Sequence, residues 1–395
     1  MTVTQEPAAA RAVETTDKVL SHLHPAGSWD VADHPVPGRK DEIWRFTPLK
    51  RLKELHADAP FRTSTTTCTW NTPEGVRVEG VDGAEAEALK GISGWVPNSR
   101  FAARVLAEVP SVLLVDVPAD LEVAEPVMVD LAGTDADNTE AGRVALRFGA
   151  HSRAVVVLSH SGSAALTQVV EIAVGDGADV TVVSLQDWAD DAVHLSHHQA
   201  KVGRDATYKH VAISFGGDLV RMDANVTYDG PGGSAELLGL YFADAGQHLE
   251  HRIFADHTAP RTKSNVVYKG ALQGEDAHTV WIGNVLIRKV AEGIDTYEEN
   301  RNLVLTDGCR ADSVPTLEIE TGEIEGAGHA SATARFDDEQ LFYLRSRGVS
   351  EEEARRLVVH GFFADLIRKI GVPALEERLQ TTVESELERH LLELG

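Results

Sequence analysis

Short runs of β-branched and aliphatic residues alternate with turns rich in Gly, Asp and Asn for more than two hundred residues after position 111. The runs are six or seven residues long and show no helical period. They read SVLLVDV, PVMVDLA, RVALRF, AVVVLSH, VVEIAV, DVTVVSL and HVAISF. Runs of this length between turn residues are typical of strands, so residues 111–336 are predicted to form a continuous β region.

The spacing of turn glycines indicates how these strands are arranged. Gly149, Gly175, Gly203 and Gly232 follow one another at nearly equal intervals, and each opens a similar stretch. A repeat whose period falls within roughly 20–50 residues predicts a solenoid. An antiparallel sandwich also has short strands and frequent turns, but the region is long for one sandwich. We therefore favour a mainly β protein with a parallel β-helix core.

The N-terminal region, residues 1–110, is predicted to be a leader followed by helical and mixed structure. The first forty residues are rich in Ala, Thr, Pro and Glu, and their prolines interrupt any helix. Pro48 marks a helix start within residues 41–52. Residues 101–109 suit a short helix that ends at Pro110.

The C-terminal region, residues 337–395, is predicted to be helical. Ser350 and Glu353 have the spacing of a capping box, and an apolar stripe at helical spacing follows them. The stripe contains Val358, Phe362, Phe363, Leu366 and Ile367. Such a stripe either covers the end of the solenoid or docks a partner protein.

Composition narrows the class of protein. The 395 residues carry 37 basic and 62 acidic side chains, and a net charge of −25 argues against nucleic acid and anionic membranes as partners. No apolar run approaches the roughly 20 residues of a spanning helix, and the N-terminus lacks an apolar signal core. We therefore expect a cytoplasmic protein. Its two cysteines, Cys68 and Cys309, are too few for a disulfide framework or a four-cysteine metal site.

Common enzyme motifs are missing from the sequence. It contains no Walker A loop, no G-x-S-x-G and no H-E-x-x-H. Residues 175–180, GDGADV, begin like a dinucleotide fingerprint, but Val180 replaces the last glycine. We expect a non-enzymatic chain that binds no nucleotide.

Two histidine clusters raise the hypothesis of a metal site, because neutral imidazole binds iron and zinc. The clusters are His194, His197 and His198, and His248, His251 and His257. Strand alternation separates His197 from its two neighbours, and separates His248 from His251 in the same way. We therefore expect solvated strand or turn histidines.

Cys309 and His329 form a more informative pair. Small residues surround His329 and leave its imidazole accessible. The separation of the two positions in the sequence is close to the length of one turn of a β-helix, so they could lie on adjacent turns of one face. A thiolate and an imidazole so placed are candidate ligands for iron or an iron–sulfur fragment. Taken alone, Cys309 also fits a small buried apolar residue.

Several long segments resemble the SufB/SufD family of iron–sulfur cluster assembly proteins. They are TAPRTKSNVVYKG (258–270), NRNLVL (300–305), VPTLEIETGEIEGAGHASAT (314–333) and QLFYLRSRG (340–348). DEIWRFTPLKRL, residues 41–52, resembles the SufD side of that family. The resemblance covers about residues 40–370. It implies a right-handed parallel β-helix flanked by helical N-terminal and C-terminal regions.

The resemblance also implies partners and cargo. It implies a complex with a SufB-like subunit and two copies of the ABC-type ATPase SufC, which binds the C-terminal helices. Transient iron–sulfur clusters or iron would form near the interface with SufB, and reduced flavin is associated with such complexes.

Individual residues follow from the same resemblance. His329 matches the family histidine at the SufB interface, so it is a tentative metal ligand. Ala327 occupies the position where some SufD proteins have a cysteine. Cys309 lies in CRADSVP, which resembles the CGAHTVP segment of SufB that carries its cluster-building cysteine. A role for Cys309 is therefore a hypothesis.

Two other functions stay open at this point. One is a stand-alone iron or flavin binding protein on a β-helix scaffold, although no flavin motif is present. The other is a carbohydrate-active enzyme with Glu318 and Glu320 as the carboxylate pair, which we expect to be solvated instead. The sequence also leaves open whether the isolated chain forms a homodimer.

Overall fold

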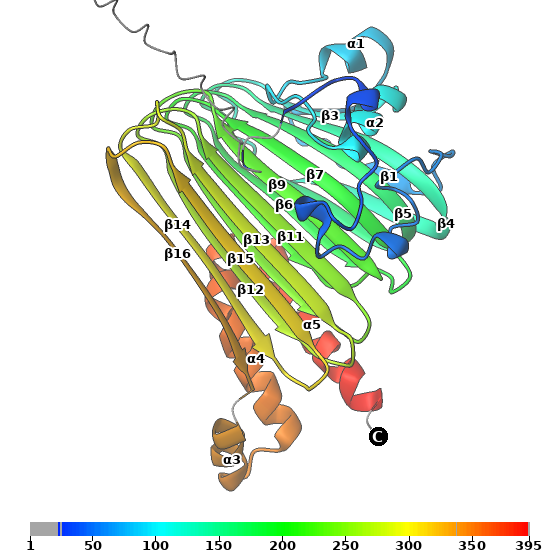
Figure 1. The fold of residues 1–395 in the computed structure, drawn as a ribbon, viewed down its shortest axis with the longest axis vertical. Helices are drawn as coiled ribbons and strands as arrows, with labels where there is room; N and C mark the ends of the chain where they lie inside the picture. The colour runs from blue at the N-terminus through cyan, green and yellow to red at the C-terminus, as the bar shows by residue number, and fades with distance from the viewer. Residues whose placement is uncertain (1–22, 24–25, 337, 394–395) are drawn as a thin grey trace, which may run out of the picture.

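The computed structural model describes residues 23, 26–336 and 338–393, and β-strands dominate the chain from Val112 to Arg335. Most of the leader predicted for the first forty residues lies outside these ranges. The strands wind into a parallel solenoid with two strands in each complete turn (Figure 1). The prediction of a parallel β-helix is confirmed, and the antiparallel sandwich is wrong.

Alternate strands of the solenoid form two facing sheets. The even sheet contains β6 (Asp179–Trp188), β8 (Thr207–Ser214), β10 (Ser234–Ala243), β12 (Lys263–Leu272), β14 (Ile294–Val304) and β16 (Ile324–Arg335). The odd sheet contains β7 (Val193–Val202), β9 (Leu219–Tyr228), β11 (His248–His257), β13 (His278–Ile287) and β15 (Arg310–Ile319). Register partners on successive turns, such as His210, Leu237 and Val266, recur at nearly the spacing of the turn glycines.

The first turns of the solenoid are built differently from the rest. The 22-residue strands β4 (Val127–Phe148) and β5 (Arg153–Val174) cross from one sheet to the other. Short strands cover them, because β1 (Thr67–Trp70) runs antiparallel to β4 and β3 (Val112–Val117) runs parallel to it. The next strand outward, β2 (Arg77–Val81), runs antiparallel to β3. This end of the solenoid is therefore covered by the chain itself.

The main core lies between the two sheets and consists of the inward-facing side chains of nearly every strand. β10 and β12 interlock there through two register pairs, Gly239 with Tyr268 and Tyr241 with Gly270. A methyl group on Gly239 would lie 2.0 Å from the ring of Tyr268. Glycine is therefore required where each tyrosine ring crosses the neighbouring strand.

The N-terminal region covers the outer face of the odd sheet. It contains short 3₁₀ turns at Val31–Asp33, Glu42–Trp44 and Leu49–Arg51, followed by α1 (Gly83–Ala88) and α2 (Arg100–Glu108). Trp44, Leu52 and Phe101 pack there against side chains such as Val193 and Leu195. The predicted helix at residues 101–109 is confirmed as α2, whereas the one predicted after Pro48 is a single 3₁₀ turn.

The C-terminal region forms α3 (Asp338–Ser346), α4 (Glu351–Ile370) and α5 (Pro373–Glu393). Helices α4 and α5 cover the outer face of the even sheet and lie behind the strands in Figure 1, whereas α3 packs against α4. One of the two hydrogen bonds of the predicted capping box is confirmed, because Ser350 Oγ accepts a hydrogen bond from the Glu353 backbone N–H. Gly371, in the left-handed conformation, ends α4.

Candidate functional site

The solenoid is open at the end formed by β15 and β16. Among the described strands, β15 pairs only with β13 and β16 only with β14. The residues of these two strands are half-buried or exposed, in contrast to the buried strands before them. Unpaired strand edges are surfaces on which a further strand or another protein can add. The open end is therefore the first candidate for a functional surface.

His329 lies near the middle of β16 at this open end, and it is exposed. Its register partner on β14 is Glu298. Register partners in a parallel ladder project to the same side of the sheet, and that side here faces the other sheet. Ala327, two residues before His329, packs against the main core from the same side. The imidazole therefore lies at the mouth of the space between the sheets.

Glu298 is a buried acid whose carboxylate is unpaired. It is 1% exposed, and neither of its carboxylate oxygens has a hydrogen-bond partner. Burial raises the pKa of Glu298 to about 8. The carboxylate fits because Gly283 on β13 has no side chain, since a Cβ there would lie 2.8 Å from Glu298 Oε1. A buried, unpaired carboxylate is costly to fold and calls for an explanation.

The polar side chains beside Glu298, by contrast, form hydrogen bonds with one another. Ser313 Oγ on β15 donates a 2.6 Å hydrogen bond to Asn300 Oδ1 on β14. Asn302 Nδ2 donates to the same oxygen at 2.9 Å, and Asn302 Oδ1 accepts from the Tyr241 hydroxyl at 2.7 Å. This network joins the last turns of both sheets, and it leaves the neighbouring carboxylate of Glu298 unpaired.

Cys309 lies in the turn between β14 and β15 and is half-buried. Its thiol donates a hydrogen bond to the Gly274 carbonyl at 3.3 Å. Burial raises the pKa of Cys309, and the carboxylates of Asp244 and Glu275 act in the same direction. The thiolate that binds iron is therefore disfavoured in the isolated chain.

The prediction that Cys309 and His329 share one face is wrong. Cys309 directly precedes a strand of the odd sheet, whereas His329 lies in the even sheet. One full turn of this solenoid is longer than the separation of these two residues, as the register partners Leu237 and Val266 on neighbouring turns show. The segment from Cys309 to His329 therefore reaches the opposite sheet instead of the next turn.

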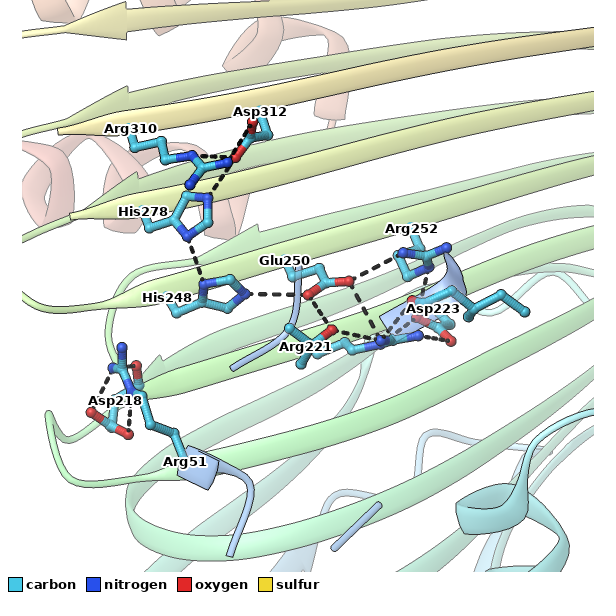
Figure 2. A network of polar contacts seen from close by, with 12 residues as sticks. Arg51, Asp218, Arg221, Asp223, His248, Glu250, Arg252, His278, Arg310 and Asp312 are labelled. Atoms are coloured by element: carbon cyan, nitrogen blue, oxygen red, sulfur yellow. Dashed lines mark hydrogen bonds and ion pairs between the residues drawn. The ribbon is translucent and has the colours of Figure 1, made fainter. Parts of the chain in front are cut away.

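A second polar group is buried on the outer face of the odd sheet, beneath the N-terminal region (Figure 2). Arg221 on β9 and Glu250 on β11 are both fully buried, with Arg221 Nη1 3.5 Å from Glu250 Oε1. Thr47 Oγ1 links them, because it accepts from Arg221 at 2.7 Å and donates to Glu250 at 2.7 Å. Although burial opposes it, the charges of Arg221 and Arg252 hold the pKa of Glu250 well below its usual value.

A chain of hydrogen bonds runs from Glu250 toward the open end, as Figure 2 shows. His248 contacts Glu250 at 3.2 Å and the ring nitrogen of His278 at 3.1 Å. His278 contacts Asp312 on β15 at 2.8 Å, and Arg310 Nε lies 2.7 Å from the same carboxylate. These contacts tie β11, β13 and β15 together where the strands begin.

A pocket of about 420 Å³ lies beside this group, between the N-terminal region and the odd sheet. Trp44, Phe254 and Arg252 contribute to its lining. The buried atoms Asn284 Oδ1 and Ser99 Oγ, also from lining residues, have no hydrogen-bond partner. Pockets of this size with a few polar groups accommodate small molecules.

The histidine clusters are buried, contrary to the expectation that they are solvated. His194, His197, His198, His248, His251 and His257 are each at most 2% exposed. The alternation was predicted correctly, since His197 stacks on Trp95 of the N-terminal region whereas His198 contacts His210 within the core. Burial lowers the pKa of His197 and His210 to about 4. Among the residues that the structure describes, no three His, Cys, Asp or Glu side chains are placed to hold a metal ion.

The C-terminal stripe packs mostly within the chain. Phe363, Leu366 and Ile367 are at most 3% exposed, and Val358 and Phe362 are half-buried against the even sheet. The structure therefore corrects the assignment of Phe363, Leu366 and Ile367 to partner docking. The helix covers a sheet face, and among the side chains that the structure describes on α3 and α4 the exposed large apolar ones are Phe342, Tyr343 and Leu357.

Glu298 and the pair Arg221–Glu250 were missed in the sequence. Glu298 lies in IDTYEENRNLV, whose frequent polar residues resemble a solvated strand. Arg221 and Glu250 are register partners one turn of the solenoid apart. Charges of opposite sign at the spacing of one turn were the signal in the sequence that could have indicated this ion pair.

Comparison with known proteins places these features in context. A family model described as SUF system FeS cluster assembly, SufBD core domain, matches residues 131–362. An iron–sulfur cluster assembly SufBD family protein of Mycobacterium tuberculosis is 53% identical over 367 residues, covering 91% of this chain and 92% of that protein. A SufBD family protein of Mycobacterium leprae is 51% identical over 366 residues, covering 91% and 93%. One from Synechocystis is 22% identical over 417 residues, covering 93% and 91%. No helix among the described residues is both long and apolar enough to cross a membrane.

Proposed function

The chain belongs to the SufBD family of iron–sulfur cluster assembly proteins, and from this premise we propose that it is a SufD-type, non-enzymatic subunit of a cytoplasmic assembly complex. Its partners would be a SufB-type subunit and the ATPase SufC. The observation that carries this proposal is the open end of the solenoid, where β15 and β16 leave their outer edges unpaired and His329 is exposed.

The last turns also expose apolar side chains that suit a partner surface. Val290, Tyr297 and Ile319 are 67%, 45% and 43% exposed. Apolar groups beside an unpaired strand edge favour association with another chain. A SufB-type subunit seated here would lie next to His329, and nascent clusters would form between the two subunits as cargo.

The ATPase is proposed to dock on α3 and α4. Phe342 and Tyr343 of α3 are 74% and 55% exposed, and Leu357 of α4 is 50% exposed. These three replace the buried stripe residues as the anchors of the docking surface. Motion driven by ATP would then reach the even sheet through α4, which packs against β10 and β12.

Co-expression with a SufB-type protein and SufC tests the proposal. We expect one complex of all three proteins by size measurement, with iron and sulfide after anaerobic reconstitution. A monomer that recruits neither partner and holds no iron would overturn it. Within the same assay, Cys309→Ser tests the thiol, because an unchanged rate of cluster formation removes Cys309 from the mechanism.

The pocket beside Arg252 favours a second candidate function, the binding of a small molecule such as reduced flavin. Its lining combines the apolar rings of Trp44 and Phe254 with unpaired polar atoms. Titration of the anaerobic complex with reduced flavin tests this candidate. Binding that Asn284→Ala weakens supports the pocket, and binding that is indifferent to it does not.

A further inference from the structure

Two histidine rings meet on the outer face of the odd sheet, where β11 and β13 begin (Figure 2). His248 and His278 are register partners, and their Nδ1 atoms lie 3.1 Å apart. The planes of the two rings are inclined at 75°. The side chain of His248 is 1% exposed and that of His278 is 20% exposed, so water reaches the pair from the side of His278.

The far nitrogen of each ring faces a carboxylate. His248 Nε2 lies 3.2 Å from Glu250 Oε2. His278 Nε2 lies 2.8 Å from Asp312 Oδ2. Both carboxylates also contact arginine side chains, which keep them ionised. Because an ionised carboxylate only accepts hydrogen bonds, each Nε2 carries the proton of its ring, and each Nδ1 carries a lone pair.

The contact between the two Nδ1 atoms therefore joins two acceptors. Two acceptors at 3.1 Å attract each other only with a cation between them, either a proton or a metal ion. With metal–nitrogen bonds of about 2.05 Å, two imidazole nitrogens on one ion are about 2.9 Å apart at a right angle and about 3.3 Å apart at the tetrahedral angle. The observed separation lies between these two values, so the rings are spaced as neighbouring ligands of one ion.

We propose that His248 and His278 bind one divalent transition-metal ion through their Nδ1 atoms, with Zn²⁺ as the ion and water at its remaining positions. Imidazole nitrogen is a common ligand of Zn²⁺. A hydrogen bond from the far nitrogen to a carboxylate is the usual support of a metal-binding histidine, so Glu250 and Asp312 are positioning residues. The chain supplies only two ligands, in agreement with the absence of any cluster of three among the described residues.

This ion would have a structural role and is distinct from the iron that the complex assembles. It would join β11 to β13 where both strands begin, beside the N-terminal region. Glu250, which orients the His248 ring, also accepts a 2.7 Å hydrogen bond from Thr47 Oγ1 of that region. The site lies on the odd sheet, apart from His329 on the even sheet, and it does not depend on the proposed function.

The test uses the full chain alone, freed of metal with a chelator and titrated with Zn²⁺ by calorimetry. The wild type is expected to bind one Zn²⁺ tightly, and His278→Gln to weaken this binding at least tenfold. Asp312→Asn should weaken it about tenfold, because the ring loses the acceptor that fixes its tautomer. His151→Gln, at an exposed position in the turn before β5, is the matched control and should bind Zn²⁺ as the wild type does.

Nitrogen NMR of the imidazole rings separates a bound metal from a shared proton. Zn²⁺ should shift the Nδ1 resonances of both His248 and His278. A proton shared by these two atoms that persists in excess Zn²⁺ would overturn the inference, and so would unchanged Zn²⁺ affinity in His278→Gln. Zn²⁺ binding that His329→Ala abolishes and His278→Gln spares would place the ion at the open end and would equally remove this site. If circular dichroism shows that His278→Gln is unfolded, the nitrogen spectrum of the wild type decides alone.

Discussion

Arg221 and Glu250 face each other on adjacent strands with no solvent access, and Thr47 of the N-terminal region bridges them. The ring of Trp44 also lies 3.9 Å from the Arg221 guanidinium carbon. The ion pair therefore serves as the attachment point for a segment that is otherwise held by short 3₁₀ turns. A buried pair of this kind is sensitive to the loss of either partner, because the remaining charge cannot reach water.

Glu250→Gln is expected to destabilise the chain by about 3 kcal/mol, since it removes one of the two carboxylates, those of Asp223 and Glu250, that offset the buried charge of Arg221. Urea unfolding followed by circular dichroism measures this loss. Trypsin should also cleave faster at Lys50 and Arg51, because the segment above the sheet is released. Glu299→Gln on the surface is the control and should change stability by less than about 0.5 kcal/mol. Equal urea midpoints for Glu250→Gln and wild type would show that the pair contributes nothing.

The buried histidines should make the protein sensitive to mild acid. Burial lowers the pKa of His160 and His210 to about 4 and that of His251 to about 3. In the unfolded chain these imidazoles take up protons near pH 6.5, so between pH 6.5 and 4 the unfolded state binds more protons. Stability therefore falls as pH falls, by about 2 kcal/mol for each such histidine at pH 5.

Urea midpoints at pH 7 and pH 5 measure this dependence. His251→Gln should reduce the loss of stability between the two pH values, because one buried titrating group is gone. His360→Gln, at an exposed position on α4, should leave the loss unchanged. A wild-type protein equally stable at both pH values would contradict the prediction.

The tyrosine–glycine interlock of β10 and β12 predicts opposite effects for two glycine substitutions. Gly239→Ala should destabilise the protein by about 3 kcal/mol, because its methyl group would overlap the fully buried ring of Tyr268. Gly361→Ala should stabilise it by about 1 kcal/mol, because Gly361 lies within α4 with no atom within 4 Å of the added methyl. Thermal unfolding of the two variants gives the comparison, and shifts of the same sign would refute this account.

The proposed docking surface on α3 and α4 predicts a separation of binding from folding. Phe342→Asp and Leu357→Asp should abolish copurification of SufC while shifting the melting temperature by less than about 2 °C, since both side chains are exposed. Phe363→Ala should instead lower stability by about 3 kcal/mol, because Phe363 is fully buried against the even sheet. Retention of SufC by both aspartate variants would exclude this surface.

The solenoid could be predicted from the sequence because its determinants are local and repeated. Several successive turns carry a similar apolar run and a turn glycine, and α4 carries both its cap at Ser350 and its stop at Gly371. The burial of the histidines could not be predicted, because it depends on covering segments distant in the sequence. His197, for example, is buried by Trp95 from the N-terminal region.

The candidate site was less accessible to prediction for a related reason. His329 was identified from its small neighbours and by resemblance, whereas its neighbour Glu298 resembles any solvated glutamate in a polar strand. Its burial depends on Gly283, which belongs to the opposite sheet. The relation between Cys309 and His329 was misjudged, although the spacing of the turn glycines already indicated a turn longer than the separation of these two residues.

The difference between the two ends of the solenoid sets a limit on self-assembly. The first turns are covered by β1, β2 and β3, of four to six residues, which offer little edge to another chain. Among the described strands, long unpaired edges lie at β15 and β16, so strand addition is expected at this end, with one such contact for each copy. A solenoid with unpaired strand edges at one end forms dimers, whereas unpaired edges at both ends would permit indefinite fibres. The short strands at the start of the solenoid thus favour a finite assembly over a fibre.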